Sequence, residues 1–275
     1  PLPFTPFKDF TGRSINEINL YSTEMSSALC SIDRVSASAN MNNRLSEAIV
    51  EAYKSTNGAP ISFELMLKCY QSRMKDANND DSISSVLKQL VNAHIFESED
   101  KVSLIDDSYI IKMDGYPKDG PIAKAIVYFL MSKLNNIYEL LDKQAVNDEV
   151  VQIRHFSIID EAHYMLDFDN RPLRNLIAVG RNKGLSIILA TQNMSSFKSK
   201  GFDFYANAQY PLIMKQQTID DKVIKDLFGV SGQELQEIRT AIAGLQKGEL
   251  IIKDQMAFAL GIGNKYNKIN VTHLI

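Results

Sequence analysis

Residues 155–192, HFSIIDEAHYMLDFDNRPLRNLIAVGRNKGLSIILATQ, decide the fold of this chain. A first apolar run, FSII, ends in the carboxylates Asp160 and Glu161, and a second run, LSIILA, ends in Thr191 and Gln192. A helical pattern separates the two runs. Short apolar runs arranged in this way are typical of buried parallel strands in an α/β sheet. Because chemistry gathers past the carboxyl ends of such strands, the four polar residues are the first candidates for a functional site.

Strand and helix patterns alternate through most of the remaining chain, which favours the α/β fold class. The other predicted strands cover residues 108–113, 210–214, 250–252 and 256–260, the last two as a hairpin. A weakly helical pattern covers residues 15–39. The other predicted helices cover residues 43–54, 62–75, 121–141, 220–228 and 233–243, and a further helix opens at Ser82. Ser62 is the expected cap of its helix, and Asn40 or Asn42 the expected cap of helix 43–54.

The sequence changes character at residues 61–107, where two helical patterns flank a polar linker. A helical insertion in a larger domain explains this pattern, and a small winged-helix module is the alternative. We therefore expect an α/β core built from residues 1–60 and 108–275, with residues 61–107 as a helical insertion.

Composition restricts the class of protein. The 275 residues are 45% hydrophobic and 23% charged, as in an ordinary soluble globular chain. The net charge of −3 excludes a global basic field, so any DNA-binding surface must be local. The cysteines, Cys30 and Cys69, show no metal-ligand spacing and fit a reducing compartment. No signal peptide and no apolar run long enough to span a membrane is present, so we expect a cytoplasmic protein without a membrane partner.

Asp160 and Glu161 have the arrangement of a Walker B motif, in which two acids follow an apolar strand. In that arrangement the first carboxylate orients Mg²⁺ through its water shell. The second polarises the water that attacks the γ-phosphate of ATP. A strand that simply ends in solvated acids is the alternative explanation.

Two further residues favour nucleotide chemistry. Gln192 follows the next apolar strand, where its side chain could contact the γ-phosphate or the attacking water and report the nucleotide state. Arg181 lies in GRNKG, at the opposite end of that strand, from which it could reach the site of a neighbouring subunit. The alternative for Arg181 is a helix C-terminal cation that answers the helix dipole.

The segments IIDEAHYML, VGRNKGLSIILATQ and LQKGELII resemble the second half of the HerA/FtsK-type ATPases. That family consists of RecA-like hexameric DNA motors, and the resemblance covers most of the chain. It implies a three-layer α/β/α fold with a mainly parallel sheet, ATP and Mg²⁺ as cofactors, and a homo-oligomeric, hexameric ring. It implies DNA as the partner, bound through its backbone. The helical insertion and the DEAH-type Walker B motif are more narrowly similar to the DptH-type ATPases of restriction systems linked to DNA phosphorothioation.

The resemblance also implies a role for each candidate residue. Asp160 corresponds to the Mg²⁺-side acid and Glu161 to the general base. Gln192 corresponds to the sensor, and Arg181 to the arginine finger supplied in trans. Two hypotheses stand for His163: it couples the site to its neighbours, or it is a structural histidine.

One departure from the family is that no G-x-x-x-x-G-K-[ST] loop occurs in the 275 residues. Without that loop the chain has no backbone cradle and no lysine for the β- and γ-phosphates. Either the loop lies upstream of Pro1 or the domain is a degenerate ATPase. The presence of all four candidate residue types favours the first explanation, and we expect the fragment alone to hydrolyse ATP poorly or not at all.

A local excess of basic residues marks a candidate DNA surface. Between residues 171 and 202 the chain has no acid and the following basic residues: Arg171, Arg174, Arg181, Lys183, Lys198 and Lys200. The loop at 193–201 is expected to line a pore and to meet DNA phosphates through Lys198 and Lys200, with Lys183 as a further candidate. A solvated loop is the alternative.

For the whole chain, the rival function is a non-catalytic α/β scaffold or assembly domain that binds other subunits of a DNA-defence or DNA-processing complex.

Overall fold

The computed structural model describes residues 1–32, 37–75, 80–116, 120–147, 150–166, 168–199, 202–208, 210–254 and 266–270. Contacts divide the chain into two compact units. The first consists of Pro1–Ile158 and Asp167–Ile188, and the second of Ile159–Leu166 and Leu189–Ile275. The division crosses both central strands, so that each strand ends in the second unit.

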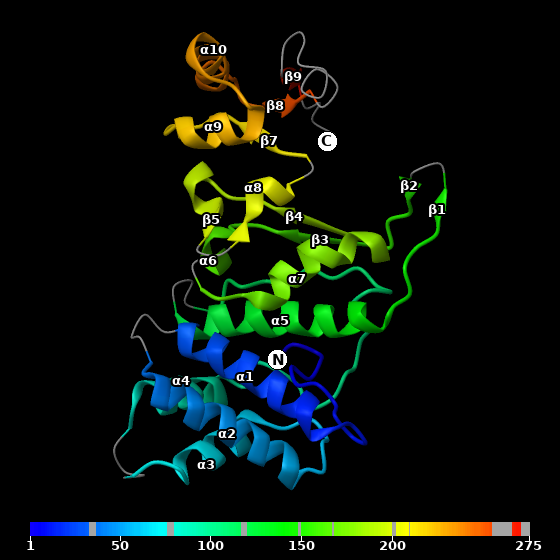
Figure 1. Ribbon diagram of the computed structural model, residues 1–275, viewed down its shortest axis with the longest axis vertical. Coiled ribbons are helices and arrows are strands. Elements are labelled where there is room, and N and C mark those ends of the chain that lie inside the picture. The colour runs from blue at the N-terminus through cyan, green and yellow to red at the C-terminus, as the bar shows by residue number, and fades with distance from the viewer. Residues whose placement is uncertain are drawn as a thin grey trace. The chain divides into compact units, whose positions relative to one another are not determined.

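Helices make up most of the first unit (Figure 1). They are α1 (Ile15–Ile32), α2 (Ala39–Ser55), α3 (Phe63–Gln71), α4 (Ser82–Ala93), α5 (Pro121–Leu140), α7 (Arg171–Val179) and the 3₁₀ helix η1 (Gly180–Lys183). The short strands β1 (Val146–Asn147) and β2 (Val150–Val151) form an antiparallel pair. Helix α2 packs against α1 and α3, and α5 packs against α1, α4 and α7.

An aromatic cluster joins three parts of the first unit that are distant in sequence. The ring of Phe7 lies 4.9 Å from that of Phe63 on α3 and 5.6 Å from that of Phe129 on α5. The rings of Phe63 and Phe129 are 5.3 Å apart. All three side chains are buried, and burying a side chain of this size stabilises a fold by about 1.5–3 kcal/mol. The cluster therefore ties the N-terminal segment and α3 to the long helix α5.

Local sequence explains where several of these helices begin. Ser62 caps α3 by accepting a hydrogen bond from the Leu65 amide at 3.2 Å, as the sequence predicts. At α2 the prediction is wrong, because Ser38 rather than Asn40 or Asn42 is the cap. Helix α2 therefore begins earlier than expected, because the side chain of Ser38 accepts a hydrogen bond from the amide of Met41 at 3.3 Å. Asp81 caps α4 in a capping box with Ser84, one residue before the predicted start.

The two central strands are β3 (His155–Ile159) and β4 (Leu185–Leu189), which pair in a two-stranded sheet. The carbonyl of Gly184 accepts bonds from the amides of Arg154 and His155, and the amide of Ala190 donates to Ile159. The pairing therefore advances in the same direction along both strands, as in a parallel sheet. Gly184, just before β4, has φ 83°, and an added Cβ there would lie 2.8 Å from the carbonyl oxygen of Gln152. Only glycine tolerates both the positive φ and the close approach of this oxygen.

The second unit contains an antiparallel sheet in the order β7-β8-β9. Its strands are β7 (Leu212–Met214), β8 (Glu249–Lys253) and β9 (Tyr266–Asn270), and its main helices are α9 (Asp221–Phe228) and α10 (Gly232–Ala243). Ile213 and Ile251, which pair across β7 and β8, share one buried cluster with Val223 and Phe228 of α9 and with residues of α10. Asp220 caps α9, and Gly229 ends it at φ 61°.

Short elements complete the second unit around the strand ends. They are α6 (His163–Leu166), η2 (Met194–Phe197), α8 (Phe204–Asn207) and the antiparallel pair β5 (Lys198–Ser199) and β6 (Phe202–Asp203). Helix α6 contacts η2, and α8 contacts α9. The segment that follows β4 is therefore folded back onto the segment that follows β3.

The mixed α/β character that we expect from the sequence is confirmed, including a small parallel sheet. The predicted strand at 108–113 is wrong: these residues form no strand, and Tyr109 and Ile110 are exposed. An apolar run becomes a strand only where another strand lies beside it, which a local pattern cannot report. The predicted strand at 256–260 lies outside the described residues. The three-layer arrangement and the limits of the helical insertion stay predictions.

Candidate functional site

The polar residues that follow β3 and β4 meet within the second unit. The amide of Ala162 donates to the carbonyl oxygen of Ala190 at 2.8 Å, and the amide of Ala190 donates to Ile159 at 2.9 Å. These bonds hold the backbone just past β3 against the backbone just past β4. The structure thereby brings Asp160 and Glu161 to the same edge as Thr191 and Gln192.

Glu161 is the centre of the contacts at this edge. Its Oε1 accepts a hydrogen bond from Nε2 of Gln192 at 2.5 Å, across 31 positions of sequence. Its backbone amide donates to Oδ1 of the neighbouring Asp160 at 2.9 Å. About a third of the Glu161 side chain is exposed, 33%, and both Asp160 and Gln192 are exposed. The carboxylates are therefore held in place but open to solvent and to a ligand.

The backbone of Glu161 is strained. It has φ 51°, in the left-handed region, which costs a residue with a side chain about 1–2 kcal/mol. Among the described residues, the other non-glycine residues with positive φ are Asn57 and His94, and His94 ends helix α4, where this conformation is common. Glu161 instead follows a strand. Strain at such a position is characteristic of residues that the surrounding structure holds for function.

His163 is the residue whose place in the site the sequence left open. Its Nδ1 lies 3.3 Å from Oε2 of Glu161 and 3.5 Å from Oγ1 of Thr191. Among the described residues, Oε2 of Glu161 is a buried atom with no hydrogen bond of ordinary geometry, and Nδ1 of His163 is a polar atom placed beside it. The only signal for this in the sequence was the position of His163, two residues after the second acid.

Arg181 belongs to the first unit, where it lies in η1 with an exposed side chain. The structure therefore does not gather it with Asp160, Glu161 and Gln192 inside one unit. Its role as a finger for a neighbouring subunit stays a prediction.

Lys183 has a defined task within the first unit. Its Nζ donates to the carbonyl oxygens of Tyr138 at 2.6 Å and Glu139 at 3.0 Å. Both carbonyls belong to the last turn of α5, where a cation offsets the negative end of the helix dipole. The ammonium of Lys183 thus anchors η1 to the end of α5, and contact of this lysine with DNA stays a prediction.

The structure describes little of the two lysines in the predicted DNA-contacting loop. Lys198 begins β5, where it stands opposite Asp203 in the strand register. Lys200 lies outside the described residues. Their contact with DNA also stays a prediction.

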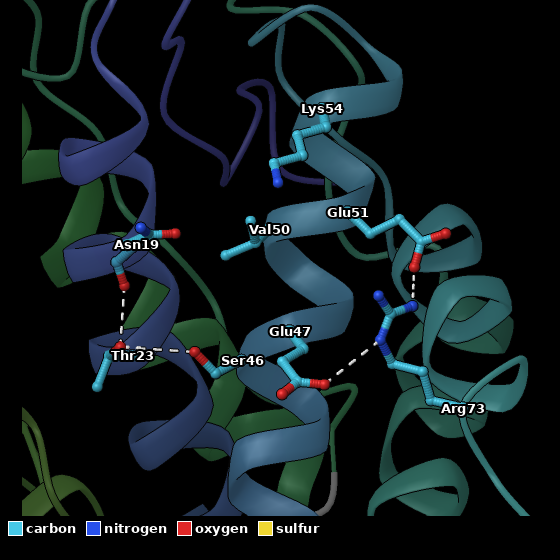
Figure 2. A pocket seen from close by; sticks show the side chains of 8 residues that line it. All are labelled: Asn19, Thr23, Ser46, Glu47, Val50, Glu51, Lys54 and Arg73. Atoms are coloured by element: carbon cyan, nitrogen blue, oxygen red, sulfur yellow. Dashed lines mark hydrogen bonds and ion pairs between the residues drawn. The ribbon is translucent and has the colours of Figure 1, made fainter.

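The first unit also has a surface groove of ≈ 490 Å³ between α1 and α2, shown in Figure 2. Its lining residues are Asn19, Thr23, Ser46, Glu47, Val50, Glu51, Lys54 and Arg73. Arg73 forms ion pairs with Glu47 and Glu51, and Thr23 donates to the carbonyl oxygen of Asn19. The groove thus contains none of the predicted site residues, and much of its polar lining is internally paired.

The donor set at the strand ends fits a magnesium ion better than an ion that needs a full cage of protein ligands. In the part of the chain that the structure describes, no three His, Cys, Asp or Glu side chains gather into a metal site. Mg²⁺ needs no such cluster, since it keeps several waters and takes one or two carboxylates together with substrate phosphates. The exposed carboxylate of Asp160 is suited to that role.

The chain is similar in fold to a solved structure. No protein-family model matches it, and no curated protein matches it. Its structure is similar to the solved structure of VirB4 of Thermoanaerobacter pseudethanolicus, with a TM-score of 0.65 and 17% sequence identity. The match covers 92% of this chain and 69% of that chain. Within the described ranges, no helix combines the length and the apolar character that a membrane crossing needs.

The match to VirB4 shows that the chain has a VirB4-like fold.

Proposed function

We propose that this chain is part of an ATPase motor of the HerA/FtsK type and that it supplies the catalytic carboxylates. The observation that carries the proposal is the hydrogen bond between Glu161 and Gln192, which joins the ends of two neighbouring parallel strands. The VirB4-like fold supports it, because VirB4 is a P-loop ATPase of the FtsK/HerA-like type. The strained backbone of Glu161 also supports a functional role for this residue.

Each residue at the strand ends has a task in this proposal. Bound Mg²⁺-ATP would supply the electrophilic γ-phosphoryl group and a cation that neutralises phosphate charge. Asp160 would hold that cation through a water molecule. Glu161 would accept the proton of the attacking water, and the amide of Gln192 would turn between Glu161 and the γ-phosphate side of the site. Arg181 would reach a neighbouring subunit and stabilise the negative charge that develops there.

A phosphate-binding loop is the part of the proposed site that these 275 residues lack. Backbone amides and a lysine must cradle the β- and γ-phosphates for efficient transfer. We therefore propose that residues outside this chain supply the cradle, and we expect the chain alone to show no measurable turnover of Mg²⁺-ATP. Turnover by the isolated chain would contradict this part of the proposal.

The motor function extends the proposal to DNA and to assembly. Subunits would form a ring, hexameric in the family that the sequence resembles, and the loop with Lys198 and Lys200 would meet the DNA backbone. Such contacts give binding that is independent of sequence and sensitive to salt. A place in a DNA-processing or restriction system, including the phosphorothioation-linked one, rests on the sequence resemblance alone.

The direct test is ATP hydrolysis by the full-length protein, measured with Mg²⁺ in the presence and absence of duplex DNA. The motor predicts hydrolysis that needs Mg²⁺ and that DNA stimulates at low salt. The absent phosphate-binding motif favours a second candidate, a scaffold or assembly domain that retains the α/β fold. A full-length protein that binds no ATP but still binds the other subunits of its complex would establish the scaffold and refute the motor.

A further inference from the structure

We propose that His163 is a positioning residue that fixes the direction of the Glu161 carboxylate through its second oxygen. The inference rests on the proposed function, in which Glu161 is the general base. It adds a residue to that site whose role the sequence left undecided between coupling and structure.

The first support is the environment of Oε2 of Glu161. This oxygen is inaccessible to solvent, and no described residue gives it a hydrogen bond of ordinary geometry. A carboxylate oxygen without a partner is costly to bury. Nδ1 of His163 lies 3.3 Å away, close enough for a charged or polar contact. A small movement of the ring would convert this contact into a hydrogen bond.

The second support is the way in which His163 is itself held. Its Nδ1 lies 3.5 Å from Oγ1 of Thr191, the residue just before Gln192. Its ring packs on the ring of Tyr164 with 4.1 Å between centroids. Both oxygens of Glu161 are thus connected to the end of β4: Oε1 directly through Gln192, and Oε2 through His163 and Thr191.

These contacts give His163 a task that Gln192 cannot perform. In the structure, the amide of Gln192 donates to Oε1, so this oxygen cannot accept a proton from a water while the contact lasts. When Gln192 turns away to sense the γ-phosphate, Oε1 is released and only the contact at Oε2 still fixes the carboxylate. His163 therefore keeps the Glu161 carboxylate in one orientation while the Gln192 side chain moves. A Glu161 carboxylate that loses this orientation can still accept a proton, but it contacts the attacking water in the wrong geometry.

Substitutions in the full-length protein test the inference. His163→Ala should lower kcat for ATP about tenfold and leave KM within about twofold, because aim matters in the transition state more than in nucleotide binding. His163→Asn should restore kcat to within about threefold of the wild type, since its amide N–H can stand near the position of Nδ1. His94→Asn, the same change at an exposed histidine on α4's C-terminus, is the matched control and should have no effect.

Several results would overturn the inference. Equal damage by asparagine and alanine at position 163 would refute it, as would a change in KM with kcat intact in both variants. A purely structural histidine would predict equal loss for both variants together with lower stability. Wild-type kcat in His163→Ala would also refute it.

Thermal unfolding of the same full-length variants separates this inference from the proposed function. His163→Ala, Glu161→Gln and the double variant form a cycle in which the shifts in Tm should fail to add, by about 2 °C or more. Additive shifts would show that the two side chains are not paired and would refute the inference. A wild-type protein that does not hydrolyse ATP, but in which the shifts fail to add, would refute the proposed function and leave the pairing intact.

Discussion

Nε2 of Gln192 lies 2.5 Å from Oε1 of Glu161, although the two residues follow different strands. The contact depends on the parallel pairing of β3 and β4, which puts both strand ends at one edge. It also depends on the left-handed backbone at Glu161, which turns the chain immediately after Asp160. The pairing of an acid with an amide at such an edge is the feature from which the proposed chemistry follows.

The strain at Glu161 predicts an unusual order of stability. Glycine adopts φ 51° at little cost, whereas alanine does not, so Glu161→Gly should be more stable than Glu161→Ala by about 1 kcal/mol. At Glu237, an exposed position within α10, the order should be the reverse by about 1 kcal/mol, since glycine weakens a helix. Chemical denaturation of the four variants measures both differences. The same order at both positions would show that Glu161 is not strained.

The proposed trans finger predicts a dependence between subunits. Arg181→Ala should lower kcat by about 10³–10⁵ without unfolding the protein, as the removal of a finger does in related phosphoryl transfer. Arg239→Ala is the control, because Arg239 is an exposed arginine on α10 that pairs with Asp221 and lies outside the candidate DNA surface. Its rate should stay near that of the wild type.

Mixing distinguishes a finger in trans from one in cis. When subunits carrying Arg181→Ala are combined with subunits carrying Glu161→Gln, some interfaces contain an intact base and an intact finger. Hydrolysis should then reappear in the mixture although each variant alone is inactive. If mixtures remain inactive at every ratio, Arg181 does not act on a neighbouring subunit.

The predicted DNA contact concerns the loop after Gln192. The double change Lys198→Ala/Lys200→Ala should weaken DNA binding equally for different sequences and reduce the slope of log K against log salt by about two. Lys222→Ala/Lys225→Ala removes the same charge from α9 and should leave the slope unchanged. Fluorescence anisotropy with duplex DNA over a range of salt concentrations measures both. An unchanged slope in the first variant would exclude these lysines as phosphate contacts.

Burial predicts a pH dependence for His155 on β3. Desolvation lowers the pKa of His155 below its ordinary value of 6.5. Below pH 6.5 the unfolded chain therefore binds a proton that the folded chain does not bind, and stability falls until the lowered folded pKa is reached. His155→Gln should lose this part of the pH dependence, as seen in the difference between the two denaturation curves from pH 7 to pH 5. Parallel curves would show that His155 titrates equally in both states.

Sequence patterns predicted the helices and the central strands well, because periodicity, caps and glycine act locally. Ser62 is an example, since it caps its helix by accepting a hydrogen bond from the amide of Leu65, three residues along the chain. The strand at Ile110 was predicted wrongly, because pairing depends on a partner elsewhere. The pattern also predicted that Glu161 and Gln192 lie at one edge of the sheet, since neighbouring parallel strands end at the same edge. It could not show that His163 faces Glu161, because that contact depends on a backbone angle that no residue preference indicates.

The central claim is that Glu161 acts as the base for ATP hydrolysis, and Glu161→Gln in the full-length protein tests it most directly. This change keeps the size of the side chain and its contact with Gln192 but removes the proton acceptor. Affinity for Mg²⁺-ATP should stay within about threefold, while kcat should fall by about 10²–10⁴. Glu237→Gln, with the same loss of charge on α10, should retain the wild-type kcat. Wild-type turnover by Glu161→Gln would contradict the account.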